Sequence, residues 1–172
     1  MKTRMILSYF IFLMLGGCNQ SVLKDQTKVS GEQEAIKKIL ETIATDFLKS
    51  WEPPFNPEGA ISLFTKSEDF HLIIDGYEIS DYEDWASSVP NFMSDDNYFF
   101  NSYTHEIKNM ETVVLSPKSG VVTIVYIWDS ISKEGVHNRT PGAATLTCRE
   151  EGNDWKIVHY HGSHDEPMEV RE

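Results

Sequence analysis

A ten-residue run near the C-terminus, from Trp155 to His164, alternates between two sets of side chains. In a β-strand, residues two positions apart share a face. In a regular strand, one face of this run would start apolar and become polar along its length. We therefore expect one end of the strand in a core and the other end on a cavity wall, although the pattern names no reaction. The residues of this face are Trp155, Ile157, His159, His161 and Ser163.

The first 17 residues are typical of a bacterial secretory signal peptide. Lys2 and Arg4 make a basic start, and the apolar run 5–15 is shorter than the ~18 residues that a membrane-spanning helix needs. Residues 15–18, Leu-Gly-Gly-Cys, resemble a lipobox. We expect cleavage before Cys18, a lipid on its thiol, and a location in the cell envelope, anchored in a membrane and facing the periplasm or the exterior. The alternative is a cytosolic protein whose first helix contains a cysteine.

The charge of the chain argues against one class of partner. The formal net charge is −12, and removal of Lys2 and Arg4 would take it to −14. Nucleic acids and anionic lipids are bound by clusters of Lys and Arg, so we expect no nucleic-acid partner and no membrane contact apart from Cys18. Cys148 would then be a lone thiol, expected to be a small buried strand residue. Phosphate-binding glycine loops and Cys-x-x-Cys pairs do not occur, so no cofactor and no metal is predicted.

The longest predicted helix lies in the N-terminal part of the chain. Residues 18–30 are polar without periodicity and are expected to be a tether between lipid and domain. Ser30 then begins a helix that Pro53 and Pro54 end. Apolar side chains recur along it with the period of a helix that packs on a core. They are Ile36, Ile39, Leu40, Ile43, Ala44, Phe47, Leu48 and Trp51.

Two shorter helices and a hairpin turn are expected next. A second helix covers 57–64, and a third, which starts with a Ser-x-x-Glu capping box, runs from Ser80 to Met93. Between them, a strand over 69–74 ends at Asp75 and Gly76, a pair that favours a tight turn.

The rest of the chain is predicted to be strands separated by turn-forming residues. The acidic tail 165–172 is expected to be frayed. Helices followed by consecutive strands indicate one α+β domain over 31–164, with three N-terminal helices packed on a curved, cone-like antiparallel sheet that holds a pocket. The predicted strands are 98–108, 111–116, 120–131, 142–150 and 153–162.

This order of elements and the closing strand resemble the nuclear transport factor 2-like superfamily, also called SnoaL-like or cystatin-like. The sharpest match is 155–163, which has the pattern Trp-x-x-Val-His-aromatic-His-x-Ser of the last strand of the association domain of calcium/calmodulin-dependent kinase II. The strand 122–127 and the turn at Asp75 and Gly76 also fit. The resemblance implies a cavity between sheet and helices, and often a homodimer through the outer sheet face. Arg149 lies beside the terminal turn, so the pocket arginine of the kinase domain is not carried over.

His161, His159 and Asp75 are the candidate catalytic residues. The two histidines share a face and, with His71 from another strand, have three open interpretations. They are hydrogen-bonded residues of a pocket wall, or ligand-orienting or acid–base groups, because imidazole titrates near neutral pH, or metal ligands, which would need a third or fourth partner. Superfamily isomerases and cyclases use an acidic residue in the cavity, which the resemblance implies for Asp75, but Asp-Gly is also a turn signal.

Aromatic residues complete the predicted ligand-binding set. Tyr126 and Trp128 share a face of a central strand, and Tyr77 and Trp85 flank the third helix. Such rings line cavities for small ligands with polar handles, and core packing explains them equally well. The full predicted set is His71, Tyr77, Trp85, Tyr126, Trp128, His159 and His161.

Three functions follow as hypotheses. The leading one is a lipid-anchored extracytoplasmic domain that binds a small molecule or a partner in its pocket without catalysis. The second is an enzyme of the isomerase, cyclase or dehydratase type that uses pocket His and Asp side chains as acid and base. The third is a dimeric assembly module. A buried carboxylate within ~3 Å of a pocket histidine would favour the enzyme, whereas an Asp75 that faces solvent would count strongly against Asp75 as its base.

Overall fold

A computed structural model describes residues 18–94 and 100–170 of the chain. The chain divides into two compact units, Met1–Ala35 and Ile36–Glu172. The described part of the first unit is helical. The second unit contains the rest of this helix and every other element, and it holds the core and the cavities. In the described part of the chain, no helix is both long enough and apolar enough to span a membrane.

Helix α1 (Cys18–Ser50) begins well before the predicted start at Ser30. The segment 18–30, expected to be irregular, is helical, and it contains no proline or glycine that would interrupt a helix. The predicted end before Pro53 is confirmed. The predicted signal peptide and the side chain of Cys18 lie outside the described residues.

The two short helices form where the sequence places them, with one difference in capping. Helix α2 (Pro57–Ser62) starts at a proline, and helix α3 (Tyr82–Phe92) ends close to its predicted boundary. The side chain of Asp81 accepts a hydrogen bond from the backbone N–H of Asp84 at 2.9 Å. Asp81 therefore caps α3, in place of the predicted cap at Ser80.

The strands form one sheet in the order β2-β1-β6-β5-β4-β3, with β7 paired to β5. The sheet was predicted to be antiparallel throughout, but β1 pairs with β6 in parallel. These two strands are far apart in the sequence, so no tight turn forces them to be antiparallel. The strands are β1 (His71–Ile74), β2 (Tyr77–Ile79), β3 (Phe100–Ser116), β4 (Ser119–Ser132), β5 (His137–Glu151), β6 (Asp154–His164) and β7 (Met168–Glu169).

Two boundaries differ from prediction, and one turn is confirmed. The predicted strands 98–108 and 111–116 are a single strand, β3, because a register shift between Ile107 and Asn109 continues the pairing. The tail is not frayed throughout, since β7 pairs with β5. The turn at Asp75 and Gly76 has positive φ at both residues, 49° and 84°, which is typical of a tight two-residue hairpin.

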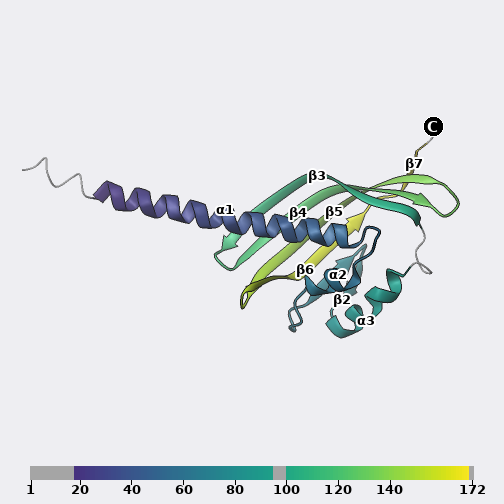
Figure 1. Cartoon of the computed structure of the whole chain (residues 1–172), viewed down its shortest axis with the longest axis horizontal. Helices are drawn as coiled ribbons and strands as arrows, with labels where there is room; N and C mark the ends of the chain where they lie inside the picture. Colours follow the sequence, from purple (N-terminus) through teal and green to yellow (C-terminus); the bar gives the residue numbers. More distant parts are fainter. Residues whose placement is uncertain (1–17, 95–99, 171–172) are drawn as a thin grey trace, which may run out of the picture. The chain divides into compact units, whose positions relative to one another are not determined.

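The inner face of the sheet, defined as the face that packs on helices, carries the core. The C-terminal half of α1 together with α2 and α3 lies on this face (Figure 1). The ring of Phe47 lies 4.9 Å from that of Tyr160. Cys148 is fully buried as predicted, and burial raises the pKa of its thiol to about 12. Fully buried core residues include Leu40, Val122, Ile124, Leu146 and Ile157.

The outer face of the sheet is more open. The central strand β4 is inner-facing at Ile124, which is fully buried, and outer-facing at Val125, which is 43% exposed. Val113 pairs with Val121 on the same outer face and is 57% exposed. Apolar side chains therefore remain exposed on this face of the described unit.

A β-bulge in the closing strand reverses the predicted alternation. Cys148 pairs with Ile157, but the preceding Thr147 pairs with His159, so Val158 is an extra residue. Ile157 and Tyr160 are both buried on the inner face, although their spacing is three. The single-face prediction for residues 155–163 is wrong, because a one-residue insertion moves all following side chains to the opposite face. Beyond the bulge, His159 and His161 point outward.

Candidate functional site

A cavity of about 280 Å³ lies between the inner face of the sheet and the helices. Its volume is near the lower end of the range of about 300–1,000 Å³ that is typical of ligand pockets. Most of the wall is aromatic or aliphatic, and a few polar groups face the same space. The lining residues are Phe47, Leu48, Trp51, Phe55, Ile74, Asp75, Phe92, Met93, Phe100, Tyr103, His105, Tyr126, Trp128, Tyr160 and His164.

One polar group of this cavity is a buried histidine with a carboxylate partner. The side chain of His105 is 4% exposed, and its Nδ1 lies 3.2 Å from Oε1 of Glu52. The same oxygen accepts the backbone N–H of His105 at 2.6 Å, so the carboxylate is held by two donors of one residue. The hydroxyl of Tyr103 lies 3.2 Å from Nε2. Burial lowers the pKa of His105 below its ordinary 6.5, although Glu52 acts in the opposite direction.

A second histidine has the same kind of surroundings at the other side of Tyr126. Nδ1 of His164 lies 3.0 Å from Oδ2 of Asp75, and its backbone N–H donates to Oδ1 at 2.8 Å. The phenol of Tyr126 lies 2.9 Å from Nε2. Asp75 is 44% exposed and His164 is 20% exposed, so this pair lies at the rim of the cavity. The cavity therefore has two carboxylate–imidazole–phenol chains.

Two glycines make room for the tyrosines of the cavity floor. A Cβ atom on Gly142 would lie 2.6 Å from the ring of Tyr126, and one on Gly162 would lie 2.2 Å from the hydroxyl of Tyr160. Each tyrosine ring therefore occupies the space beside a glycine that a side chain at that glycine would fill. Burial raises the pKa of Tyr126 to about 12 and that of Tyr160 well above 10, so both remain neutral donors near neutral pH.

Two indole N–H groups of cavity residues have no hydrogen-bond partner in the described part of the chain. They belong to Trp51 and Trp128, and both nitrogen atoms are buried. A buried donor without a partner costs roughly 1–3 kcal/mol. An acceptor atom of a bound molecule would remove this cost at either position.

The predicted ligand-binding residues divide into three groups. Tyr126 and Trp128 line the cavity as expected. Trp85 is buried in an aromatic cluster with Phe64 and Phe70, away from the cavity lining, and Tyr77 is 77% exposed in the hairpin. Asp75 forms the predicted turn and also lines the cavity, but its side chain is 44% exposed, which favours the turn over a role as catalytic base.

The remaining predicted residues meet on the outer face. Nδ1 of His71 lies 3.0 Å from Nδ1 of His159, and Nε2 of His71 lies 2.8 Å from Glu78. His161 is exposed on the same face. None of these three histidines lines the cavity: the bulge in β6 turns His159 and His161 away from it, and His71 on β1 pairs beside His159. The described residues contain no group of three or more His, Cys, Asp or Glu side chains arranged to hold a metal ion.

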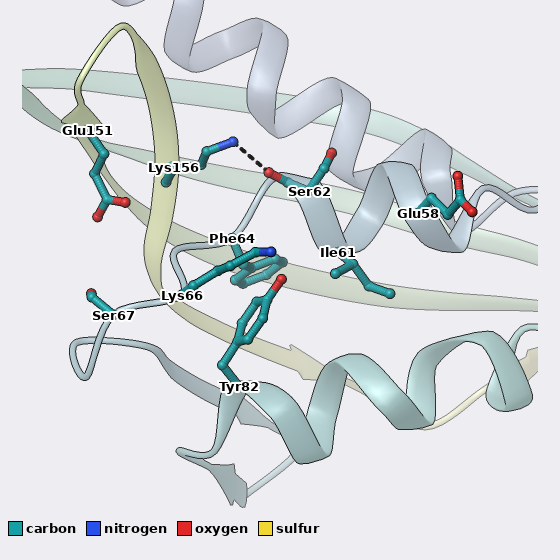
Figure 2. A pocket seen from close by; sticks show the side chains of 9 residues that line it. All are labelled: Glu58, Ile61, Ser62, Phe64, Lys66, Ser67, Tyr82, Glu151 and Lys156. Atoms are coloured by element: carbon teal, nitrogen blue, oxygen red, sulfur yellow. Dashed lines mark hydrogen bonds between the residues drawn. The ribbon is translucent and has the colours of Figure 1, made fainter.

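A second hollow, of about 550 Å³, lies between α2, α3 and the start of β6. Figure 2 shows Lys66 and Tyr82 beside Phe64, with Lys156 reaching the backbone carbonyl of Ser62 at 2.8 Å. Its Glu151 is already bound by Arg149 at 2.7 Å. No histidine lines this hollow. Lys156 and Glu151 thus have partners within the fold, and Lys66 lies over the ring of Tyr82 at 5.8 Å. We place the candidate site in the smaller cavity, which two histidines line.

Sequence reasoning missed the Glu52–His105 pair and misjudged His164. Tyr103 and His105 share a face of a predicted strand, which was a usable signal. Glu52 follows the end of a helix and carries no such signal. His164 was expected to lie beyond the closing strand, but β6 extends to it and brings it beside Asp75.

Comparisons with known proteins agree on the fold. No family model and no curated protein matches the sequence. A putative scytalone dehydratase from Novosphingobium aromaticivorans is similar in structure, with a TM-score of 0.68 at 14% identity over 83% of this chain and 93% of that chain. A hexachlorocyclohexane dehydrochlorinase, LinA type 2, gives 0.67 at 11% identity over the same shares.

A nuclear transport factor 2-like protein from Salmonella enterica serovar Typhimurium gives a TM-score of 0.60 at 17% identity, over 78% of this chain and 92% of that chain. Another similar structure, from Caulobacter vibrioides, is described as having a cystatin-like fold. At these identities the likeness concerns the fold alone. The chain has the α+β fold of nuclear transport factor 2-like, or SnoaL-like, proteins, as the resemblance of its elements predicts.

Proposed function

We propose that the protein is an enzyme that moves protons on a small, mostly apolar molecule bound in the inner cavity, in an elimination or isomerisation. The observation that carries this proposal is the Glu52–His105 pair, in which His105 lines the cavity and the carboxylate of Glu52, behind the lining, lies 3.2 Å from its imidazole. Similarity in fold to a putative dehydratase and a dehydrochlorinase is consistent with it by analogy only.

His105 is the general base in this proposal. The Nδ1–H of His105 donates a hydrogen bond to Glu52, so the lone pair of Nε2 is available. Burial keeps the imidazole neutral near pH 7, because the pKa lies below 6.5. The substrate replaces the hydroxyl of Tyr103 at Nε2 and presents a C–H bond there. Glu52 holds the ring orientation and stabilises the imidazolium that forms.

The wall of the cavity defines the substrate class. Aromatic and aliphatic side chains surround most of the space, which favours a compact apolar or cyclic skeleton. The buried indole N–H groups of Trp51 and Trp128, which have no partner among residues 18–94 and 100–170, favour a carbonyl or another acceptor on that skeleton. A small cyclic ketone combines these properties and has acidic C–H bonds beside its carbonyl.

The test uses the full chain with cyclohexanone in D2O. Nuclear magnetic resonance follows the exchange of the α-hydrogens for deuterium. A parallel sample in H2O, where the indole N–H groups keep their protons, reports the indole signals of Trp51 and Trp128, identified by substitution with phenylalanine. We expect shifted indole signals and catalysed exchange that falls about 10²- to 10⁴-fold in His105→Gln, the usual contribution of a general base. His159→Gln, on the outer face, is the matched control and should keep the activity.

Each other outcome contradicts part of the proposal. Shifted indole signals without exchange would show a cavity that binds but does not catalyse, in agreement with the non-catalytic hypothesis. Unchanged indole signals would show that the ketone does not bind in the cavity. Equal exchange in His105→Gln and His159→Gln would remove His105 as the base.

We also propose that the domain acts in the cell envelope, held to a membrane by a lipid on Cys18. The support is the sequence of residues 1–18 alone. Cys18→Ser should move the protein from the membrane fraction to the soluble extracytoplasmic fraction, and a variant that stays in the membrane fraction would refute the anchor.

A homodimer through the outer face is proposed from its exposed apolar side chains, such as Val113 and Val125.

A further inference from the structure

Resting on the proposed function, we propose that Asp75, His164 and Tyr126 form a second, proton-donating chain, which lets the enzyme expel a leaving group that must be protonated. The two histidines would then have different roles in one cavity. His105 removes a proton from carbon, and the second chain delivers a proton to an oxygen that departs. The preferred substrate class is therefore a β-hydroxy carbonyl compound, which loses water.

The second chain is held in place by several independent contacts. The Asp75 carboxylate accepts from both the backbone N–H and Nδ1 of His164, at 2.8 and 3.0 Å. The backbone N–H of Asp75 donates to the carbonyl of Gly162 at 3.0 Å. The β1–β2 turn and the end of β6 are thus joined by main-chain and side-chain bonds. This fixes both the orientation of the imidazole and the nitrogen that faces Tyr126.

The order of the groups sets the path of proton movement. With Nδ1 bound to Asp75, Nε2 is the nitrogen that exchanges protons with the phenol of Tyr126, 2.9 Å away. Tyr126 also shares a hydrogen bond with the phenol of Tyr160. When the imidazole carries both protons, Nε2 donates to the phenol oxygen, and the phenol O–H no longer donates to Nε2 and can donate to a bound molecule. Asp75 and His164 lie at the rim, where water can return the proton.

Tyr126 stands between the two chains. Its ring centroid lies 5.2 Å from that of His105 and 5.9 Å from that of His164. A substrate in contact with the Tyr126 hydroxyl is therefore close to both imidazoles. Burial keeps the phenol protonated, since its pKa is about 12. One molecule can be deprotonated from one side and protonated from the other.

The reaction balances without an oxidant or a reductant. Nε2 of His105 takes the hydrogen on the carbon next to the carbonyl, and that electron pair forms the carbon–carbon double bond. The bond from the neighbouring carbon to its hydroxyl breaks, and the oxygen leaves as water with the proton of Tyr126. Tyr126 takes a proton from His164. Solvent then removes the proton from His105 and returns one to His164. A halide would leave as an anion and would need no such proton.

The test compares two substrates that give the same product, cyclohexenone, which is followed by its ultraviolet absorbance. They are 3-hydroxycyclohexanone and 3-chlorocyclohexanone. We expect His164→Gln to lower the rate with the hydroxy compound by about 10²- to 10⁴-fold and the rate with the chloro compound far less. Tyr126→Phe keeps the ring and removes the terminal donor, so it should give the same contrast even if His164→Gln folds poorly. His161→Gln, exposed on the outer face, is the control for both substrates.

Equal losses on the two substrates would show that the second chain only supports the structure and would overturn the inference. A wild-type protein that exchanges cyclohexanone but does not eliminate water would also overturn it, while leaving the proposed function intact. Absence of exchange would instead mean failure of the proposed function. A selective loss of elimination from the hydroxy compound supports both.

Discussion

The two faces of the sheet carry the same chemical groups in different settings. On the inner face, His105 and His164 each have a carboxylate and a tyrosine as partners and border a cavity. On the outer face, His71 has Glu78 and His159 as partners, and none of the three lines the inner cavity. A histidine near a carboxylate is therefore not by itself a site. Enclosure against a space that a small molecule can enter distinguishes the inner pairs.

The difference also concerns apolar side chains. The inner face buries its aliphatic residues completely at Ile124 and Leu146, whereas the outer face leaves Val125 43% exposed. Aliphatic side chains that are buried on the inner face stabilise the fold. The same kinds of side chain, exposed on the outer face, form a surface available to a partner. Substitutions of residues that face opposite sides of the sheet test this contrast.

The largest effect is expected for Ile124→Ala compared with Val125→Ala. Ile124 is fully buried, so the truncation should lower the free energy of unfolding by ~2–5 kcal/mol. Val125→Ala should cost within about 0.5 kcal/mol in the monomer. Urea denaturation of both variants measures this. A Val125 effect that grows with protein concentration would indicate the outer-face dimer, and equal costs at low concentration would contradict the two-face description.

A smaller effect is expected for Gly162→Ala compared with Ser163→Ala. The new methyl group would lie 2.2 Å from the hydroxyl of Tyr160, a side chain only 4% exposed, so the ring must move within a closed space. We expect a loss of ~1–3 kcal/mol. Ser163 is exposed, and its substitution should stay within about 0.5 kcal/mol. Thermal or urea unfolding decides, and a Gly162→Ala protein as stable as the wild type would show that Tyr160 is not held against this glycine.

The smallest effect concerns the pH dependence of stability. Burial lowers the pKa of His105 below 6.5, and burial together with His71 and His161 lowers that of His159. Below pH 6.5 the unfolded chain therefore binds more protons than the folded one at these positions, so stability falls as the pH falls. Unfolding curves between pH 5 and 7.5 should show a shallower slope in His105→Gln than in the wild type.

The matched variant for this slope is His159→Gln. His105 is the more deeply enclosed of the two, so its substitution should flatten the slope more. If His159→Gln flattens it more, the outer pair is the stronger pH-sensitive element. In that case the contrast in burial between the faces does not extend to their histidines.

Much of the fold was predictable because its signals are local. Helical periodicity, the prolines after α1 and the Asp75-Gly76 turn depend on neighbouring residues, and the three predicted helices and the turn are present, whereas two of the predicted strands are the single strand β3. Pairing between distant segments was not predictable in the same way. The parallel contact of β1 with β6 and the docking of β7 on β5 arise from tertiary packing. The extended start of α1 shows that absence of an apolar stripe does not prevent a helix.

The candidate site was predicted only in part. Tyr126, Trp128 and Asp75 were named from the sequence and do line the cavity. His159 and His161 were assigned to the cavity by strict alternation, and the bulge at Val158 moved them to the outer face. Glu52 and His105 were missed because their proximity depends on where the end of α1 meets β3.

The sequence by itself determined the kinds of element, their order and the chemical groups available, because these follow from periodicity and turn residues within short windows. Only the tertiary structure decided which histidines face the cavity. A strand has two faces, and one extra residue in its pairing with β5 exchanges them. The partners of the functional groups were likewise decided by folding, since Asp75 and His164 lie 3.0 Å apart only when the β1–β2 turn packs beside the end of β6.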